Sequence, residues 1–146
     1  MEVFCLNGYQ DEKIQLELID VLGFPEATSY EGGYDMICRL VIQIGCCHID
    51  CERLYSATGA LQRFSEELKG CYATLKGKAE YRLLLEQGLV FEVEMKGSGH
   101  AVVTGQFRER PDRRTVFSFE METDQSCFPA VFQGIDLLNE RYKGHT

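Results

Sequence analysis

The residues best suited to chemistry form one cluster, Cys46-Cys47-His48-Ile49-Asp50-Cys51. Cysteine sulfur and histidine nitrogen are the ligands that zinc prefers, and ligands two to four residues apart can hold one ion. A closed tetrahedral site needs further ligands, and the remaining candidates, Cys71, His100 and Cys127, stand alone on separate segments. We therefore expect no metal site, with the cysteines acting as small apolar residues. Metal binding or thiol reactivity in this cluster is the alternative that the sequence leaves open.

Catalytic arrangements find little support in the chain. A cysteine nucleophile needs a base within hydrogen-bond reach and an oxyanion donor, and no signature ties His100 to a thiol. Glu92 and Glu94 could imitate the carboxylate pair of a glycosidase. Two residues apart on a strand, however, they share one face, which alternation marks as the solvated one. We predict a protein that is not an enzyme and has no cofactor.

Two further motifs could bind phosphate groups. Gly97-Ser98-Gly99 leads into a strand, whereas a phosphate-binding loop leads through Gly-Lys-Ser/Thr into a helix. Four arginines surround one turn, but Glu109 and Asp112 interleave with them, which favours pairing within the turn. The arginines are Arg108, Arg110, Arg113 and Arg114. We expect no nucleic-acid partner.

Length and composition indicate an ordinary globular chain. The 146 residues are 45% hydrophobic and 26% charged, which fits one domain, 1–146. No apolar run approaches the roughly 20 residues of a membrane span, and the N-terminus has no basic and apolar signal-peptide regions. The seven cysteines are an odd number, so we expect reduced thiols. These features predict a cytoplasmic protein with no membrane partner.

The acidic charge is concentrated near the N-terminus. The chain carries a formal charge of −8, and residues 1–36 hold eight acids against one base, Lys13. The acids are Glu2, Asp11, Glu12, Glu17, Asp20, Glu26, Glu31 and Asp35. Such a surface repels phosphates and attracts basic partners, although acids also serve solubility alone.

Alternation of apolar residues predicts antiparallel strands along most of the chain. The segments are 14–19, 36–49 (one bent strand or two joined near Gly45), 79–86, 89–95, 101–107 and 117–122. Gln87-Gly88 and Gly97-Ser98-Gly99 read as tight turns, and Gly105 as a bulge or twist point. Because the connections are short, the last four strands should form a meander with one apolar face and one solvated face.

Helical periodicity predicts two amphipathic helices. The first begins at about Thr58, with Ser56 or Thr58 as its cap and Gly77 after its end. The second follows a cap at Asp124 or Ser126, with Pro129 in its first turn. Their apolar stripes are Leu61, Phe64, Leu68, Cys71, Tyr72 and Leu75, and Val131, Phe132, Ile135, Leu138 and Tyr142. The predicted class is α+β, a two-layer domain with an acidic 1–35 segment, a 36–142 core and a flexible 143–146 tail.

The order of these motifs resembles the WapI-type immunity family over about residues 35–142. The resemblance rests on Phe64-Ser65-Glu66-Glu67-Leu68, then Leu75-Lys76-Gly77-Lys78-Ala79, then the meander, then Phe119 and Thr123-Asp124-Gln125-Ser126. Members of that family are small cytoplasmic proteins encoded beside toxic C-terminal domains of bacterial polymorphic and contact-dependent toxins. The shared residues are fold determinants, so the resemblance transfers no binding site.

The resemblance implies an immunity protein that occludes a cognate toxin, with a basic nuclease as one such toxin. An acidic surface would steer that association, so we expect the contacts among acids outside the core. These are Glu26, Glu31 and Asp35 near the loops, and Glu92, Glu94, Glu120 and Glu122 on the solvated sheet face. The alternatives are a protein-binding or scaffold domain without a toxin partner, and a small-ligand-binding domain.

Overall fold

The computed structural model describes residues 1–85 and 88–143, which form eight strands and two α-helices. The strands are β1 (Glu2–Asn7), β2 (Lys13–Leu22), β3 (Asp35–Ile44), β4 (Cys47–Ala57), β5 (Lys78–Tyr81), β6 (Leu89–Gly97), β7 (His100–Phe107) and β8 (Phe117–Asp124). The helices are α1 (Thr58–Thr74) and α2 (Phe128–Arg141), and a short 3-10 turn, Gln125–Cys127, precedes α2. The predicted α+β class is confirmed. The 144–146 part of the predicted flexible tail lies outside the described residues.

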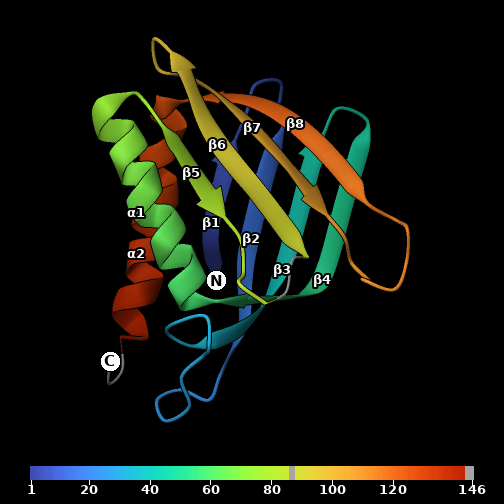
Figure 1. The fold of residues 1–146 in the computed structure, drawn as a ribbon, viewed down its shortest axis with the longest axis vertical. Helices are drawn as coiled ribbons and strands as arrows, with labels where there is room; N and C mark the ends of the chain where they lie inside the picture. Colours follow the sequence, from blue (N-terminus) through green and yellow to red (C-terminus); the bar gives the residue numbers. More distant parts are fainter. Residues whose placement is uncertain (86–87, 144–146) are drawn as a thin grey trace.

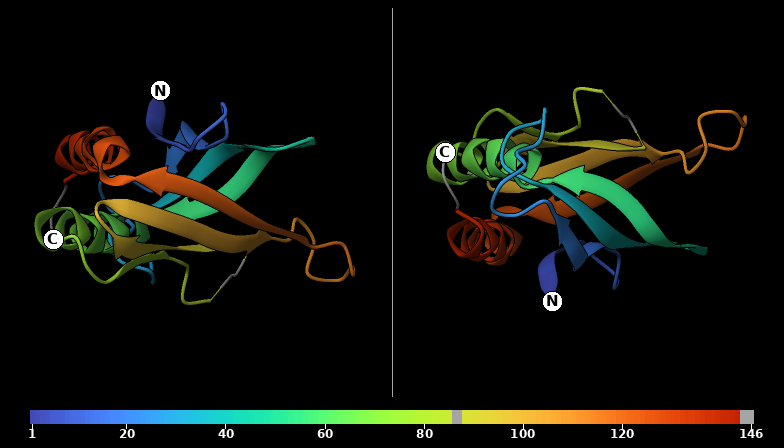
Figure 2. Two further views of the ribbon diagram at one scale, coloured as in Figure 1. Left: turned by 90° about the horizontal axis from the view of Figure 1, so that it is seen from above. Right: turned by 90° about the horizontal axis from the view of Figure 1, so that it is seen from below.

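The strands divide into two antiparallel sheets, in the orders β1-β2-β3-β4 and β5-β6-β7-β8. Figure 1 shows the second sheet lying obliquely across the first, and Figure 2 shows two layers with both helices on the same side. There α2 packs beside β1 and α1 beside β5. Each sheet therefore covers the apolar face of the other, and the helices close one side of the space between them.

Aromatic side chains fill the junction between the helices and the sheets. The ring of Phe64 on α1 lies 5.2 Å from that of Phe91 on β6 and 6.2 Å from that of Phe4 on β1. Tyr81 stacks on Phe91 at 5.5 Å, and its hydroxyl lies 2.6 Å from the Ser56 hydroxyl. One continuous hydrophobic cluster thus joins both helices to both sheets.

The N-terminal strands follow the predicted pattern only in part. The sequence did not predict β1, and β4 continues to Ala57, beyond the predicted end at residue 49. Segment 14–19 lies within β2, and segment 36–49 covers β3 and the start of β4, which are joined near Gly45, whose φ is 57°. An irregularity in β4 opposite Cys38 and Leu40 changes the alternation, so Cys51 and Leu54 both face inward.

The predicted strand at 79–86 is wrong for residues 82–85, and residue 86 lies outside the described residues. β5 ends at Tyr81, and Leu85, predicted on the apolar face, is 70% exposed. The amides of Leu84 and Leu85 donate to the Glu31 carboxylate at 2.6 and 3.0 Å, instead of continuing the ladder with β6. The predicted turn at Gln87-Gly88 falls partly outside the described residues.

The predicted side-chain cap of α1 is also wrong. Neither Ser56 nor Thr58 caps it; the cap residue is Ala57, without a side-chain hydrogen bond. Instead the first two helical amides donate to backbone carbonyls, Thr58 to Tyr34 and Gly59 to Gly32. These carbonyls accept hydrogen bonds from backbone amides that have no partner within the first turn of the helix. α1 ends at Thr74, and the next residue, Leu75, has a left-handed backbone conformation. The predicted Gly77 follows two residues later.

Two glycines permit close backbone contacts. At Gly105, where a bulge or twist point was predicted, the pairing register continues unshifted, and an added Cβ would lie 2.4 Å from the Val90 carbonyl oxygen. At Gly134 on α2, an added Cβ would lie 2.2 Å from the carbonyl oxygen of Val3 on β1. The helix can approach the sheet edge this closely only where it lacks a side chain.

We expect Gly134→Ala to destabilise the protein by about 1–3 kcal/mol, because α2 must move away from β1. Gly70→Ala is the matched control: Gly70 lies in α1 with no atom near its Cβ position. Alanine should there stabilise the helix by up to about 1 kcal/mol. Urea denaturation measures both, and equal effects of the two substitutions would contradict the close contact.

The predicted cap at Asp124 belongs to the 3-10 turn Gln125–Cys127 that leads into α2, whereas the cap residue of α2 itself is Cys127, which makes no side-chain hydrogen bond. The Asp124 carboxylate accepts from the Ser126 amide at 2.9 Å, and Pro129 lies in the first turn of α2. Hydrogen bonding from the Ser126 hydroxyl holds the pKa of Asp124 below its ordinary value of 3.8. A carboxyl group with a lowered pKa stabilises the fold fully above its ordinary pKa and loses that effect as the pH falls through the lowered value.

We expect Asp124→Ala to cost about 1 kcal/mol at neutral pH through loss of this cap. The difference in unfolding free energy between this variant and the unsubstituted protein should shrink as the pH falls below the ordinary pKa of 3.8. Protonation of Asp124 in the unsubstituted protein then removes the same charge that the substitution removes. Denaturation midpoints measured through this range check the result. A difference that stays constant down to low pH would contradict it.

Candidate functional site

The outer face of the β5-β8 sheet carries most of the predicted binding acids. The register aligns Glu94, Val102 and Glu122 in one row, and Glu92, Thr104 and Glu120 in the next. Glu80, which was not predicted, extends the second row because it pairs with Glu92. The sequence placed these carboxylates on one face by their alternation, and the structure brings them together across three strands.

Nearby cations pair with some of these carboxylates. Lys78 lies 3.8 Å from the Glu92 carboxylate and 3.4 Å from that of Glu94, and Lys96 also binds Glu94. The two lysines, Lys96 foremost, hold the pKa of Glu94 below its ordinary value. The acids of β8 are more exposed, and Glu122 has only His100 at 3.5 Å among the ion pairs of the described residues. The β8 side of this face therefore carries the less compensated negative charge.

The three predicted acids near the N-terminal loop have different environments. Glu26 is exposed in the loop after β2. Asp35 begins β3 and accepts a hydrogen bond from the Tyr55 hydroxyl. Glu31, predicted to lie outside the core, is only 3% exposed, so its carboxylate does not face solvent.

Glu31 instead joins three separate segments. Its carboxylate accepts from the Leu84 and Leu85 amides, and Arg63 on α1 approaches it at 3.6 Å. Arg63 also donates to the Glu31 carbonyl at 2.6 Å. A buried carboxylate needs such donors, since burial without them is unfavourable by several kcal/mol. We call Glu31, Arg63 and the amides of Leu84 and Leu85 the Glu31 junction.

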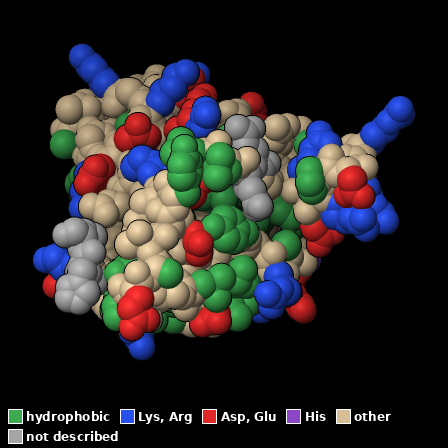
Figure 3. Space-filling view, turned by 60° about the horizontal axis from the view of Figure 1, so that its bottom comes forward, with side chains coloured by type: hydrophobic (Ala, Val, Ile, Leu, Met, Phe, Trp, Pro, Cys, Tyr) green, Lys and Arg blue, Asp and Glu red, His purple; other side chains and the backbone are tan. Residues whose placement is uncertain are grey.

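The junction leaves an apolar patch at the surface. Leu84 is 54% exposed and Leu85 is 70% exposed, while Tyr30, the neighbour of Glu31 in the chain, is 77% exposed. Figure 3 shows hydrophobic side chains gathered near the middle of this end of the molecule, with acidic side chains among them. Sequence reasoning missed this patch. One residue could have indicated the patch from the sequence. Leu84 is apolar, although the alternation of the predicted 79–86 strand requires a polar residue at that position.

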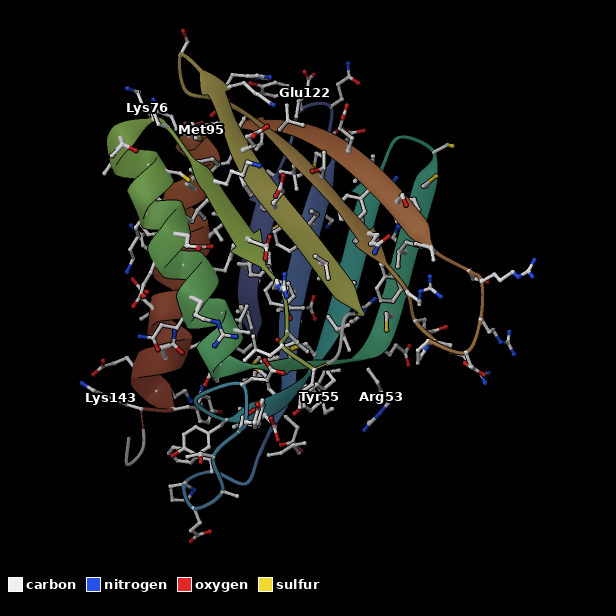
Figure 4. All side chains as sticks on the ribbon, viewed as in Figure 1. Arg53, Tyr55, Lys76, Met95, Glu122 and Lys143 are labelled. Carbon is white, nitrogen blue, oxygen red and sulfur yellow. The ribbon has the colours of Figure 1, made fainter. Side chains whose placement is uncertain are left out.

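A cleft of about 610 Å³ lies between β4 and the end of β7. Its lining mixes Leu54, Leu83 and Phe107 with charged groups that include Arg53 and Glu109. Figure 4 places Arg53 and Tyr55 at the lower end of the molecule and Glu122 at the opposite end. The cleft and the acidic β8 side are therefore separate surfaces.

The cysteine cluster is split between surface and core. Cys46 and Cys47 are exposed at the β3–β4 turn, whereas Cys51 is buried. Burial raises the pKa of Cys38 to about 12 and raises that of Cys51, and a hydrogen bond to Cys46 raises that of Cys47. Cys38, Cys47 and Cys51 therefore do not have the lowered pKa that is typical of a reactive thiol. Over residues 1–85 and 88–143, no three His, Cys, Asp or Glu side chains are grouped so as to hold a metal ion.

The four-arginine turn is partly self-paired, as predicted. Arg110 binds Asp112 through two hydrogen bonds of 2.8 and 3.1 Å, and Arg108 donates to the Arg113 carbonyl at 2.7 Å. The turn thus presents a mixed charge rather than a preformed anion clamp.

Fold and surface together define a small α+β protein whose exposed features are an acidic sheet face and an apolar patch. The chain matches the model of the immunity protein WapI-like family over residues 5–143 and belongs to that family. No curated protein matches it significantly. Family membership supports a toxin-neutralising role in general, through binding to a cognate toxin. None of the helices in the described part of the chain is long and apolar enough to span a membrane.

Replacing Glu31 by alanine should destabilise the protein by about 2–4 kcal/mol, since two amides and Arg63 lose their shared acceptor. Glu26→Ala removes an equal charge from the exposed loop and should change stability by less than about 0.5 kcal/mol. Chemical denaturation of both variants measures the difference. Similar midpoints for the two variants would show that the junction does not hold these segments together.

Proposed function

We propose that this protein neutralises its cognate toxin domain by binding and occluding it, without catalysis of its own. A basic toxin would complement the acidic charge of this protein. A nuclease, which binds the phosphate backbone of nucleic acid through basic residues, is one such toxin. The acidic outer face of the β5-β8 sheet is the observation that carries this proposal. Both partners would meet in the cytoplasm, without nucleic acid or membrane as a partner of this chain.

Charge supports the association in two ways. Carboxylates on β6 and β8, on either side of β7, create a negative potential that accelerates encounter with a basic partner, an effect that salt screens over about 10 Å at 0.1 M. The same carboxylates could occupy the positions that substrate phosphates take on a nuclease. We assign this role to Glu92, Glu94, Glu120 and Glu122, with Glu26 and Asp35 as further contacts near the loops. Glu31 is not assigned to the contact surface because its carboxylate is buried.

The cleft beside β4 favours a second candidate function, the binding of a small ligand. Its volume of about 610 Å³ lies within the range of ligand pockets, roughly 300–1,000 Å³. Its many charged lining residues are less typical of such pockets, which are predominantly apolar. A protein-binding role without a toxin would use the same outer surfaces.

The first test is co-purification of the tagged protein with the toxin domain encoded by the adjacent gene, at low and high salt. We expect a complex that salt weakens. The double variant Glu120→Lys/Glu122→Lys should slow association about 10-fold at low salt, because it reverses the charge on the β8 side.

The control is Glu66→Lys/Glu140→Lys, which changes the net charge equally on exposed positions of α1 and α2. Association kinetics, measured by surface plasmon resonance, should separate the two variants. Equal association rates for both would remove the outer sheet face from the proposed interface. Absence of any complex at either salt concentration would overturn the proposed function.

A further inference from the structure

The Glu31 junction determines how residues 82–85 face the solvent. Leu83 points into the core and is 3% exposed, whereas Leu84 and Leu85 are exposed. Their backbone amides are the groups that bind the Glu31 carboxylate, so their side chains take no part in those hydrogen bonds. The junction thus holds two leucine side chains at the surface on a fixed backbone.

The segment containing Glu31 is itself fixed on the start of α1. An added Cβ on Gly33 would lie 2.0 Å from the Thr58 hydroxyl oxygen, and one on Gly59 would lie 2.5 Å from the Gly32 carbonyl. The Tyr34 amide donates to the Thr58 hydroxyl at 2.9 Å. Tyr30, one residue before Glu31, therefore extends from an anchored segment, so a partner that covers it need not order the backbone at Glu31.

The surroundings of this patch are acidic. Besides the buried Glu31, residues 17–35 contain four acids and no lysine, arginine or histidine. The two arginines adjoining the patch are engaged with carboxylates, Arg63 with Glu31 and Arg82 with Glu80 at 3.4 Å. The patch therefore combines an apolar centre with flanking negative charge, the composition of an interface whose partner is apolar at its centre and basic around it.

We propose that Tyr30, Leu84 and Leu85 form the central contact for the cognate toxin domain, which covers them with apolar side chains and places basic residues against the flanking acids. This inference rests on the proposed function and adds an apolar contact to the acidic sheet face assigned there. Tyrosine is enriched among the residues on which an interface depends most, and the fixed backbone at Leu84 and Leu85 lowers the cost of ordering these side chains in a complex.

Charge favours a basic protein over other occupants of the patch. A symmetric contact with a second copy would bring the same acidic segment against itself, which is repulsive. An anionic membrane surface would meet the same repulsion.

The test compares Leu84→Ser/Leu85→Ser with Leu137→Ser in binding to the toxin domain. Leu137 on α2 is 69% exposed, which closely matches Leu85, and it belongs to neither segment of the patch. The substitutions at 84 and 85 keep the amides that bind Glu31, so thermal stability should be unchanged. We expect the double variant to lose at least about 10-fold in affinity, mainly through faster dissociation, while Leu137→Ser binds as the unsubstituted protein does.

Tyr30→Ser provides an independent variant on the other segment, and it should also weaken binding. If the unsubstituted protein binds the toxin and all three variants bind equally well, the patch is not the contact and the proposed function still stands. If the unsubstituted protein does not bind, the proposed function fails first. A dimer in sedimentation that the Leu84→Ser/Leu85→Ser variant abolishes would overturn the inference in favour of self-association.

Discussion

The fold depends on one constraint: each of its two sheets is apolar on a single face. Neither sheet could leave that face in water, so the two lie across one another, and α1 and α2 close the side along β5 and β1. Phe64 on α1 connects the two sheets, since its ring meets Phe4 on one sheet and Phe91 on the other. The outer face of the β5-β8 sheet is consequently free to carry carboxylates.

The Glu31 junction is the main polar exception inside this apolar arrangement. A buried carboxylate does not by itself indicate stability, because desolvation opposes the attraction between charges. Here its donors come from α1 and from the segment after β5, so it specifies how distant parts of the chain meet. The same contact ends β5 at Tyr81 and turns Leu84 and Leu85 outward.

The acidic sheet face and the apolar patch suit different stages of one association. Long-range charge acts on the rate of encounter, whereas desolvated apolar contacts act on how long a complex lasts. An immunity protein needs both fast capture and slow release, because free toxin damages its host. Family membership supports the toxin-neutralising role, while the position and chemistry of the contact are our proposals.

The sequence by itself determined the elements whose signals are local. Alternation located β6, β7 and β8 and placed Glu92, Glu94, Glu120 and Glu122 on one face, because neighbouring side chains on a strand point to opposite sides. Tertiary structure decided the division into two sheets, the backbone cap of α1 and the burial of Glu31. These features depend on partners such as Leu84, 53 residues from Glu31. No local periodicity encodes a contact of that separation, so only the folded chain turns an expected surface acid into a buried one and an expected core leucine into an exposed one.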